Sequence, residues 1–533
     1  MLISIVKRYF LFLCLAGIVL YFQSCLENDF SYPIEKMYVT SVKIEGQIGE
    51  SVISQDDRVV TVELADTVNI KKVRIESIEV TEGGRLSFPL DTLLDLSNPF
   101  LFNVSKYQDY QWALKATQNM NYSFVVKGQV GSSVFYPEIK QATTFVSKKQ
   151  GLAWLELTDL KLGPTGAIYN EGNPIDILMV EGANYATAQV RVQYKDFFDE
   201  VWTLNVYTTD LEVETKSANA WAYYAKLYGV GLEDADNGFE YKKTTDSEWI
   251  KVSGDDVVFN NGVFEALVTG LQPNTNYVFK AYSDGAYGDE MNFTTEEALQ
   301  LPNSSFESVS GDSPLYLYGE GEEMWWDSGN HGSATLNRNV TTVDTSIKHS
   351  GNQSLLLSSQ NVVIKFAAGN VFAGKYLKTD GTDGILGFGR PFTSRPTKLK
   401  GYIKYNCGVV DKGGDKITNG QNDKGTVYVA LTDGDGVAYD DGSKWSCIIK
   451  TKTGQLFDKN ASNVFAYGEM ILNESTEGDG LIPFEIKLDY KSTDRVPTRI
   501  VIVASASYYG DFFQGSTSSK MWLDDITLEY DYE

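Results

Sequence analysis

Residues 322–332, EEMWWDSGNHG, gather side chains that could bind a sugar or take part in acid–base chemistry. Sugar binding uses aromatic rings that stack on the C–H face of the sugar and planar polar groups that bond its hydroxyls. This stretch offers both kinds of group, in Trp325, Trp326, Asp327, Asn330 and His331. Neighbouring side chains of an extended segment point in opposite directions, so one tryptophan should be buried and the other exposed. The competing interpretation is an aromatic corner that seals a β-sandwich.

A second loop, YYGDFF, offers the same combination of groups in Tyr508, Tyr509 and Asp511. Glycoside hydrolysis needs two carboxyl groups at a suitable separation, and Asp327 with Asp511 would be the pair if the protein were an enzyme. The sequence gives no separation between the two, so ordinary loop acids remain the alternative for both residues.

Other catalytic chemistries lack their motifs. The chain contains no G-x-S-x-G, no H-E-x-x-H and no phosphate-binding G-x-x-x-x-G-K-[ST]. It has two histidines, His331 and His349, so a Ser-His-Asp triad has few ways to form. The sequence therefore favours a non-catalytic protein over a hydrolase.

The composition describes an acidic chain with several folded domains. At 533 residues the chain is too long for one core, and its formal net charge is −25 at pH 7. Such a surface repels phosphate backbones and anionic lipid headgroups, so nucleic acid is not an expected partner. Neutral sugars and cations such as Ca²⁺ remain compatible with this charge.

The N-terminus, MLISIVKRYFLFLCLAGIVLYFQSC, has the layout of a secretory signal, with basic residues before a short apolar run. Small Ser24 before Cys25 resembles a bacterial lipobox, which implies a signal peptide over residues 1–24 and lipidation of Cys25. The acids that follow in CLENDF resemble export signals of surface lipoproteins in Bacteroidetes. We therefore expect an outer-membrane lipoprotein that faces the cell surface, with ordinary cleavage or an uncleaved anchor as alternatives.

The folded sequence retains two cysteines, Cys407 and Cys447, because Cys14 would leave with the signal. An oxidising compartment would permit a disulfide between them. Two buried thiols fit the strand-like runs around them equally well, so both states remain open.

An internal repeat follows the predicted linker 25–34. KIEGQIGESV recurs as VVKGQVGSSV, and YQDYQWALKA recurs as FFDEVWTLNV, which places Trp112 over Trp202. Short alternating runs between Gly, Asp and Asn turns predict strands, and the repeat length suits an immunoglobulin-like sandwich. We expect two Ig-like repeats, 35–120 and 121–210, each with its tryptophan in the core.

Residues 211–297 resemble a fibronectin type III domain over nearly their whole length. GLQPNTNY supplies the turn before a strand, and Tyr277 stands where the corner tyrosine of that family bonds back to the backbone. The resemblance implies a third β-sandwich that serves as a spacer.

The C-terminal part, residues 300–533, contains many runs of strand length, such as GTVYVALTD and TRIVIVASAS. A jelly roll of two packed antiparallel sheets can bury that many strands, so the whole chain is expected to be all-β. LPNSSFES, WWDSGN, HSGNQSLLLSS, FGRPFTSRPTKLKGYIKYN and YYGDFFQGSTSSKMWLDDITLEY occur in this order. This set resembles the putative carbohydrate metabolism domain of Bacteroidetes lipoproteins, which implies a shape like that of sugar-binding jelly rolls and no defined reaction.

The ends of this domain also resemble many carbohydrate-binding jelly rolls, in which the first and last strands hold a structural Ca²⁺. The resemblance implies an oxygen site at Glu307, Asp524 and Asp525. The alternative is that these acids cap strand ends in solvent.

These features together predict a glycan-binding accessory protein for polysaccharide capture, anchored to the membrane by its N-terminal lipid. Its expected partners are a poly- or oligosaccharide and the proteins of a glycan-uptake system. The alternatives are a glycoside hydrolase and an adhesion or assembly protein whose sandwich modules bind other proteins.

Overall fold

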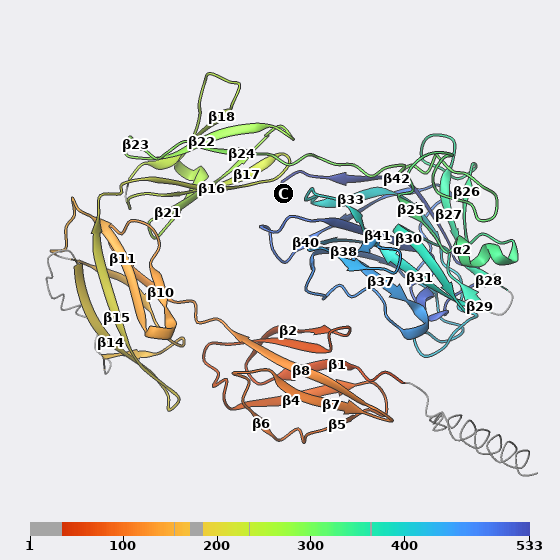
Figure 1. Ribbon diagram of the computed structural model, residues 1–533, viewed down its shortest axis with the longest axis horizontal. Coiled ribbons are helices and arrows are strands. Elements are labelled where there is room, and N and C mark those ends of the chain that lie inside the picture. Colours follow the sequence, from red (N-terminus) through yellow and green to blue (C-terminus); the bar gives the residue numbers. More distant parts are fainter. Residues whose placement is uncertain (1–34, 154, 171–184, 234, 363–364, 533) are drawn as a thin grey trace, which may run out of the picture. The chain divides into compact units, whose positions relative to one another are not determined.

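The computed structural model describes residues 35–533 except 154, 171–184, 234, 363–364 and 533 (Figure 1). The predicted signal peptide and Cys25 lie outside the described residues. Almost all regular structure is β-strand, which confirms the predicted all-β fold. Within the described part of the chain, no helix has the length and apolar character needed to cross a membrane.

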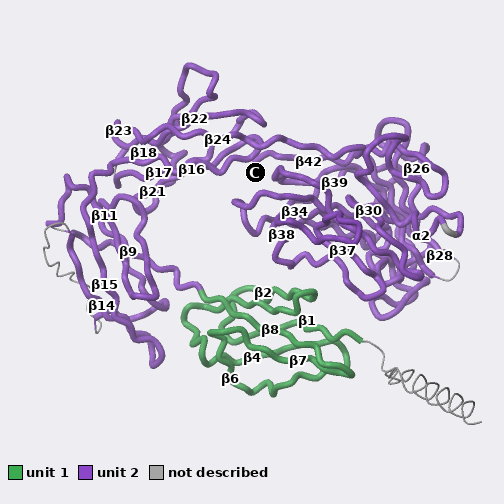
Figure 2. The backbone as a smooth tube through the Cα atoms, in the orientation of Figure 1, with its two compact units in different colours: residues 1–118 green, residues 119–533 purple. Residues whose placement is uncertain are grey.

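The chain forms two compact units, residues 1–118 and 119–533 (Figure 2). In the first unit, two sheets enclose a core around the fully buried Trp112. The larger sheet has the order β2 (Gln47–Ser54), β3 (Val59–Leu64), β8 (Asp109–Gln118), β7 (Phe100–Ser105) and β5 (Arg85–Leu86). The smaller sheet has the order β1 (Val39–Ile44), β4 (Val73–Val80) and β6 (Leu93–Leu94).

The second unit begins with the second copy of the repeat, whose core holds Trp202, also fully buried. Its larger sheet has the order β10 (Val134–Tyr136), β11 (Gln141–Ser147), β15 (Phe198–Thr209), β14 (Tyr185–Tyr194) and β13 (Ile168–Tyr169). Its smaller sheet pairs β12 (Leu157–Lys161) with β9 (Ser123–Val126). The parallel pair β3–β8 of the first copy recurs as β11–β15, and the prediction of a core tryptophan in each copy is confirmed.

The repeated G-Q-x-G motif forms the same turn in both copies. The Gln47 side chain accepts the N–H of Ile44 and donates to the carbonyl of Gly49. The Gln129 side chain likewise accepts the N–H of Val126 and donates to the carbonyl of Gly131. The glycines on both sides of each glutamine have positive φ, which explains why glycine stands there. The sequence repeat is therefore a repeat of structure.

Residues 211–297 form two further sheets around a core of their own. One sheet has the order β16 (Glu214–Ala220), β17 (Tyr224–Val230), β21 (Val263–Thr269) and β20 (Val257–Asn260). The other contains β19 (Ile250–Ser253), β18 (Asn237–Lys243), β22 (Asn276–Ser283), β23 (Ala286–Tyr287) and β24 (Met291–Thr294). The hydroxyl of buried Tyr277 accepts the N–H of Gln272 at 2.9 Å, which confirms the predicted corner tyrosine.

The C-terminal domain consists of two antiparallel sheets packed against each other. The larger, nine-stranded sheet contains β37 (Cys447–Lys450), β31 (Asp383–Phe388), β30 (Asn370–Asp380), β41 (Arg499–Ser505), β34 (Gly425–Thr432), β38 (Val464–Leu472) and β40 (Asp489–Tyr490), with β25 (Trp326–Asp327) and β32 (Arg390–Pro391) at its side. The smaller sheet contains β26 (Thr341–Asp344), β27 (Ser354–Ser358), β42 (Lys520–Glu529), β33 (Lys398–Asn406) and β39 (Ile482–Lys487). Two hairpins, β28 (Gln360–Val362) with β29 (Lys365–Ala367) and β35 (Val437–Ala438) with β36 (Lys444–Trp445), lie apart from these sheets.

Alternation along the strands of the nine-stranded sheet gives it two different faces. In β34, Val427, Val429 and Leu431 point into the core between the sheets, whereas Tyr428 and Ala430 point to the opposite face. That opposite face, here called the outer face, carries a second apolar cluster. Cys407 and Cys447 are not joined in a disulfide.

The fibronectin-like module and the C-terminal domain share a buried joint around Arg395. Arg395 is 3% exposed, and its guanidinium pairs with Glu296 at 2.6 Å. It also donates to the side chain of Asn219 at 2.8 Å and lies 4.5 Å from the ring centre of Trp221. The two domains therefore form one packed body at this joint, where a simple spacer was expected.

Candidate functional site

The structure buries the tryptophans of the 322–332 segment. Trp326 is completely buried, donates its indole N–H to the carbonyl of Pro302 at 2.8 Å and packs on Phe306. Trp325 is partly buried against the same core, with its ring 4.7 Å from that of Trp326. The prediction of Trp326 as a sugar platform is wrong, because no ligand can reach a ring in the core.

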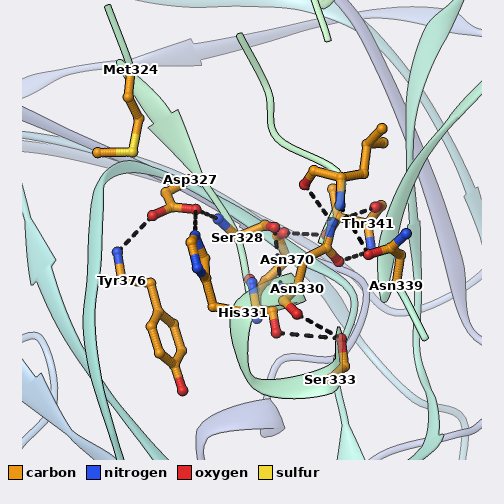
Figure 3. Close-up of polar contacts among 12 residues, drawn as sticks. Met324, Asp327, Ser328, Asn330, His331, Ser333, Asn339, Thr341, Asn370 and Tyr376 are labelled. Atoms are coloured by element: carbon orange, nitrogen blue, oxygen red, sulfur yellow. Dashed lines mark hydrogen bonds and ion pairs between the residues drawn. The ribbon is translucent and has the colours of Figure 1, made fainter. Parts of the chain in front are cut away.

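Asp327 is likewise used by the fold (Figure 3). It is 5% exposed, and its two oxygens accept the N–H groups of Ser328 and Tyr376 at 2.8 and 2.7 Å. The Nε2 atom of His331 lies 3.0 Å from one of the same oxygens. A carboxylate with these three partners joins the turn to β30, which gives Asp327 a structural role where a sugar ligand was predicted. Its role as a catalytic acid stays a prediction.

Asn330 begins the short helix α2 (Asn330–Ser333) and is fully buried. Its amide donates to the carbonyls of Leu315 and Thr341 and accepts the N–H of Thr341 at 2.9 Å (Figure 3). With every polar atom of its side chain bonded to backbone, Asn330 also cannot bind a sugar as predicted. His331 stays partly exposed and stacks on Tyr376, with ring centres 5.1 Å apart.

The second predicted loop remains accessible. Tyr508 and Asp511 are exposed, and Tyr508 meets Tyr509 edge to face with ring centres 5.0 Å apart. Asp511 lies in the single turn η6 (Gly510–Phe512). Burial of its carboxyl group raises the pKa of Asp511 to about 6.

A buried carboxylate that the sequence analysis missed holds this loop in place. Asp423 is completely buried, and one of its oxygens accepts hydrogen bonds from Ser507, Ser516 and Ser519 at 2.7 to 2.8 Å. The adjacent Lys424 carbonyl accepts the N–H of Tyr508 at 2.6 Å. Both ends of the loop are therefore tied to the start of β34.

Next to the loop, three aromatic side chains gather on the outer face of the nine-stranded sheet. Tyr428 of β34 and Tyr467 of β38 have ring centres 6.0 Å apart, and Phe457 lies 5.2 Å from Tyr428 and 6.3 Å from Tyr467. All three are half-buried, and their planes meet at 21 to 36 degrees. The alternation in GTVYVALTD could have shown that Tyr428 faces away from the core, whereas its ring neighbours come from distant segments.

Charged groups border these rings. Glu469 lies opposite Tyr428 in the β34–β38 register, and Lys459 lies 4.0 Å from Glu469 and 5.2 Å from the ring centre of Tyr467. Burial raises the pKa of Tyr428 well above its usual value, and the charge of Asp511 adds to this effect. We call Tyr428, Phe457, Tyr467, Glu469 and Asp511 the aromatic–carboxylate surface. It offers rings for stacking and carboxylates that accept hydrogen bonds from hydroxyls.

The structure brings the predicted calcium ligands around one loop, residues 349–353. The two carboxylate oxygens of Glu307 accept N–H groups from Asn352 and Gln353. Asp524 accepts the N–H of His349 at 2.7 Å, and Asp525 bonds the His349 ring. These oxygens therefore accept hydrogen bonds from the 349–353 loop, and the described residues contain no group of three or more acidic, His or Cys side chains suited to a metal. The calcium site stays a prediction.

The comparison with protein families agrees with the motifs of the C-terminal domain. Residues 304–529 match the family described as "Putative carbohydrate metabolism domain". This confirms the predicted resemblance for that segment of the chain. No curated protein matches the chain by sequence.

Three solved structures illustrate the structural likenesses. A putative glycoside hydrolase from Bacteroides thetaiotaomicron is 13% identical, with 94% of this chain and 99% of that chain covered and a TM-score of 0.30. Another from Bacteroides vulgatus is 21% identical, with coverages of 43% and 97% and a TM-score of 0.32. The Bacteroides ovatus protein SGBP-B, solved with a mixed-linkage heptasaccharide, is 11% identical, with coverages of 80% and 92% and a TM-score of 0.18.

Proposed function

We propose that this protein is a non-catalytic glycan-binding lipoprotein that captures polysaccharide at the cell surface. The observation that carries the proposal is the aromatic–carboxylate surface, which lies on the domain that matches a carbohydrate family. Half-buried rings beside hydrogen-bonding carboxylates are what sugar recognition requires. The accessible pair Tyr508 and Tyr509 extends the same surface.

The anchor is a separate part of this proposal. Cys25 after the apolar run supports lipidation, and the acids behind it support export to the cell surface, where proteins of a glycan-uptake system would be neighbours. Metabolic labelling with a fatty acid tests the anchor: wild type should incorporate label and Cys25→Ala should not. Equal labelling of both proteins would refute lipidation at this residue.

Glycan binding is tested by electrophoresis of the protein without its signal through gels that contain one soluble polysaccharide each. A β-glucan, a xylan, a mannan and a uronate polymer form the panel. We expect retardation by at least one neutral polymer, and weaker retardation of Tyr428→Ala and Phe457→Ala by the same polymer. Tyr287→Ala removes a 52% exposed tyrosine from the fibronectin-like module and should migrate as wild type in every gel.

Failure of every polymer to retard wild type would overturn the proposal. So would retardation that Tyr428→Ala and Phe457→Ala leave unchanged, because the aromatic–carboxylate surface would then have no part in binding.

One observation favours glycoside hydrolysis as a second candidate. Burial raises the pKa of Asp511 to about 6, so this carboxyl group retains part of its protons near neutral pH, as a general acid must, and the charges of Asp511 and Glu469 both act on Tyr428. A hydrolase would release reducing sugar from the panel and lose this activity in Asp511→Asn while still binding. Release of sugar by wild type would replace the non-catalytic proposal.

A further inference from the structure

The second repeat carries a row of aromatic side chains on the solvent side of its larger sheet. Phe145 of β11, Tyr207 of β15 and Tyr185 of β14 are neighbours on three adjacent strands. Their ring centres are 5.9 and 5.4 Å apart, and Phe145 and Tyr185 are 38% and 41% exposed. Trp202 and the other core residues of β15 point to the opposite side of this sheet.

The first repeat shows that the fold does not need this row. The parallel pair β3–β8 of the first repeat corresponds to β11–β15 of the second. Glu63 of β3 lies opposite Thr117 of β8, at the positions where the second repeat has Phe145 opposite Tyr207. Both Glu63 and Thr117 are exposed. Because the same sheet is built with polar residues at these two positions, the aromatic pair in the second copy has no structural requirement behind it.

A side-chain amide lies beside the row. Asn205 is on the same side of β15 as Tyr207, two residues before it, and is only 6% exposed. Among the described residues, its amide is not one of the side-chain polar groups that are closed off from solvent without a partner, so it stays open to bonding a ligand. The first repeat has exposed Lys115 at this position.

The charges around the row favour an uncharged ligand. Arg191 is held by Asp199 through two hydrogen bonds of 2.9 and 2.7 Å. Lys140 and Lys148 at the two ends of β11 pair with Glu200 and Asp210. Because these three cations already pair with carboxylates, they are less available to a polymer of sugar acids, whereas rings and an amide suit neutral sugars.

We propose that the Phe145–Tyr207–Tyr185 row and Asn205 form a second glycan-binding site, which takes a neutral polysaccharide chain. This site is independent of the aromatic–carboxylate surface of the C-terminal domain. Two sites on one chain would bind the same polysaccharide with avidity, since the second contact forms within the complex.

The test replaces the two aromatic residues of the second repeat with the residues that stand at the corresponding positions of the first repeat. Phe145→Glu with Tyr207→Thr is the double variant, and Glu63→Gln with Thr117→Ser in the first repeat is its matched control. Electrophoresis in gels with a β-glucan, a xylan or a mannan should show at least a several-fold weaker retardation of the double variant, with the control unchanged. Asn205→Asp should weaken retardation too, because a carboxylate cannot donate to a sugar oxygen.

Retardation of the double variant equal to that of wild type would overturn the second site. The site would also be overturned if the double variant changed self-association of the protein in analytical ultracentrifugation but left retardation unchanged. Equal melting temperatures of wild type and variant show that a loss of binding is local. Combination with Tyr428→Ala separates the two sites. If the C-terminal variant alone abolishes retardation by every polymer, the second site is refuted and the proposed function stands. If the double variant, without Tyr428→Ala, abolishes retardation by every polymer, the C-terminal site is refuted.

Discussion

Removal of the Arg395 side chain should strongly destabilise the second compact unit. In Arg395→Met, Glu296 would keep its carboxylate in the joint without the guanidinium that lies 2.6 Å away. Burial already raises the pKa of Glu296 with the arginine present, so the uncompensated charge would be costly. Breaking a buried pair by removing one partner costs about 3–5 kcal/mol, and the lost stacking on Trp221 adds to this.

Urea unfolding followed by tryptophan fluorescence measures this cost. The matched control is Arg495→Met, which breaks the bidentate pair with Asp433 in the same domain, where both side chains are about one-third exposed. Exposed pairs contribute about 0.2–1 kcal/mol, so the control should lose far less stability. Glu296→Gln combined with Arg395→Met should recover part of the loss, because the double variant leaves no buried charge. An Arg395→Met variant no less stable than Arg495→Met would refute the buried joint.

Three further predictions concern single carboxylates. The pKa of Asp511 in the folded protein is raised to about 6, so the folded protein binds more protons than the unfolded chain between about pH 4 and 6, and its stability falls as pH rises through that window. Asp511→Asn should therefore raise the melting temperature at pH 8 and leave it unchanged at pH 3.5. An equal change of the melting temperature at both pH values would contradict the raised pKa. Asp327→Ala should lower the free energy of unfolding by about 2–4 kcal/mol, because it leaves the N–H groups of Ser328 and Tyr376 unpaired. It should not change glycan retardation, and loss of retardation in a variant of normal stability would identify Asp327 as a ligand. Glu307→Gln should lower the melting temperature equally with EDTA and with added Ca²⁺, whereas a calcium-induced rise in wild type that the variant lacks would establish the predicted calcium site.

Local patterns predicted most of the fold. Alternation and turn residues identified the strands, and repeated G-Q-x-G and tryptophan positions identified the two repeats, because these signals depend on neighbouring residues. The corner tyrosine Tyr277 was predicted from the resemblance of residues 211–297 to the fibronectin type III family. The pairing of Glu296 with Arg395 was not predicted, because the two residues are about a hundred positions apart and no local pattern connects them.

The site was harder to predict. Trp326, Asp327 and Asn330 have the right chemistry for sugars, but their polar atoms bond backbone groups of other segments. Residue types alone cannot distinguish a buried carboxylate that organises a turn from one that meets a ligand. The aromatic–carboxylate surface combines β34, β38 and two loops, so its members become neighbours only when the nine-stranded sheet forms.

Hydrogen–deuterium exchange with and without saturating polysaccharide tests the central claim most directly. The polymer that retards the protein most strongly is the ligand to use. The account predicts slower exchange in residues 424–432, 455–469 and 505–513, which carry the aromatic–carboxylate surface, and unchanged exchange around residues 322–332. Protection around 322–332 with none in the other three segments would contradict it.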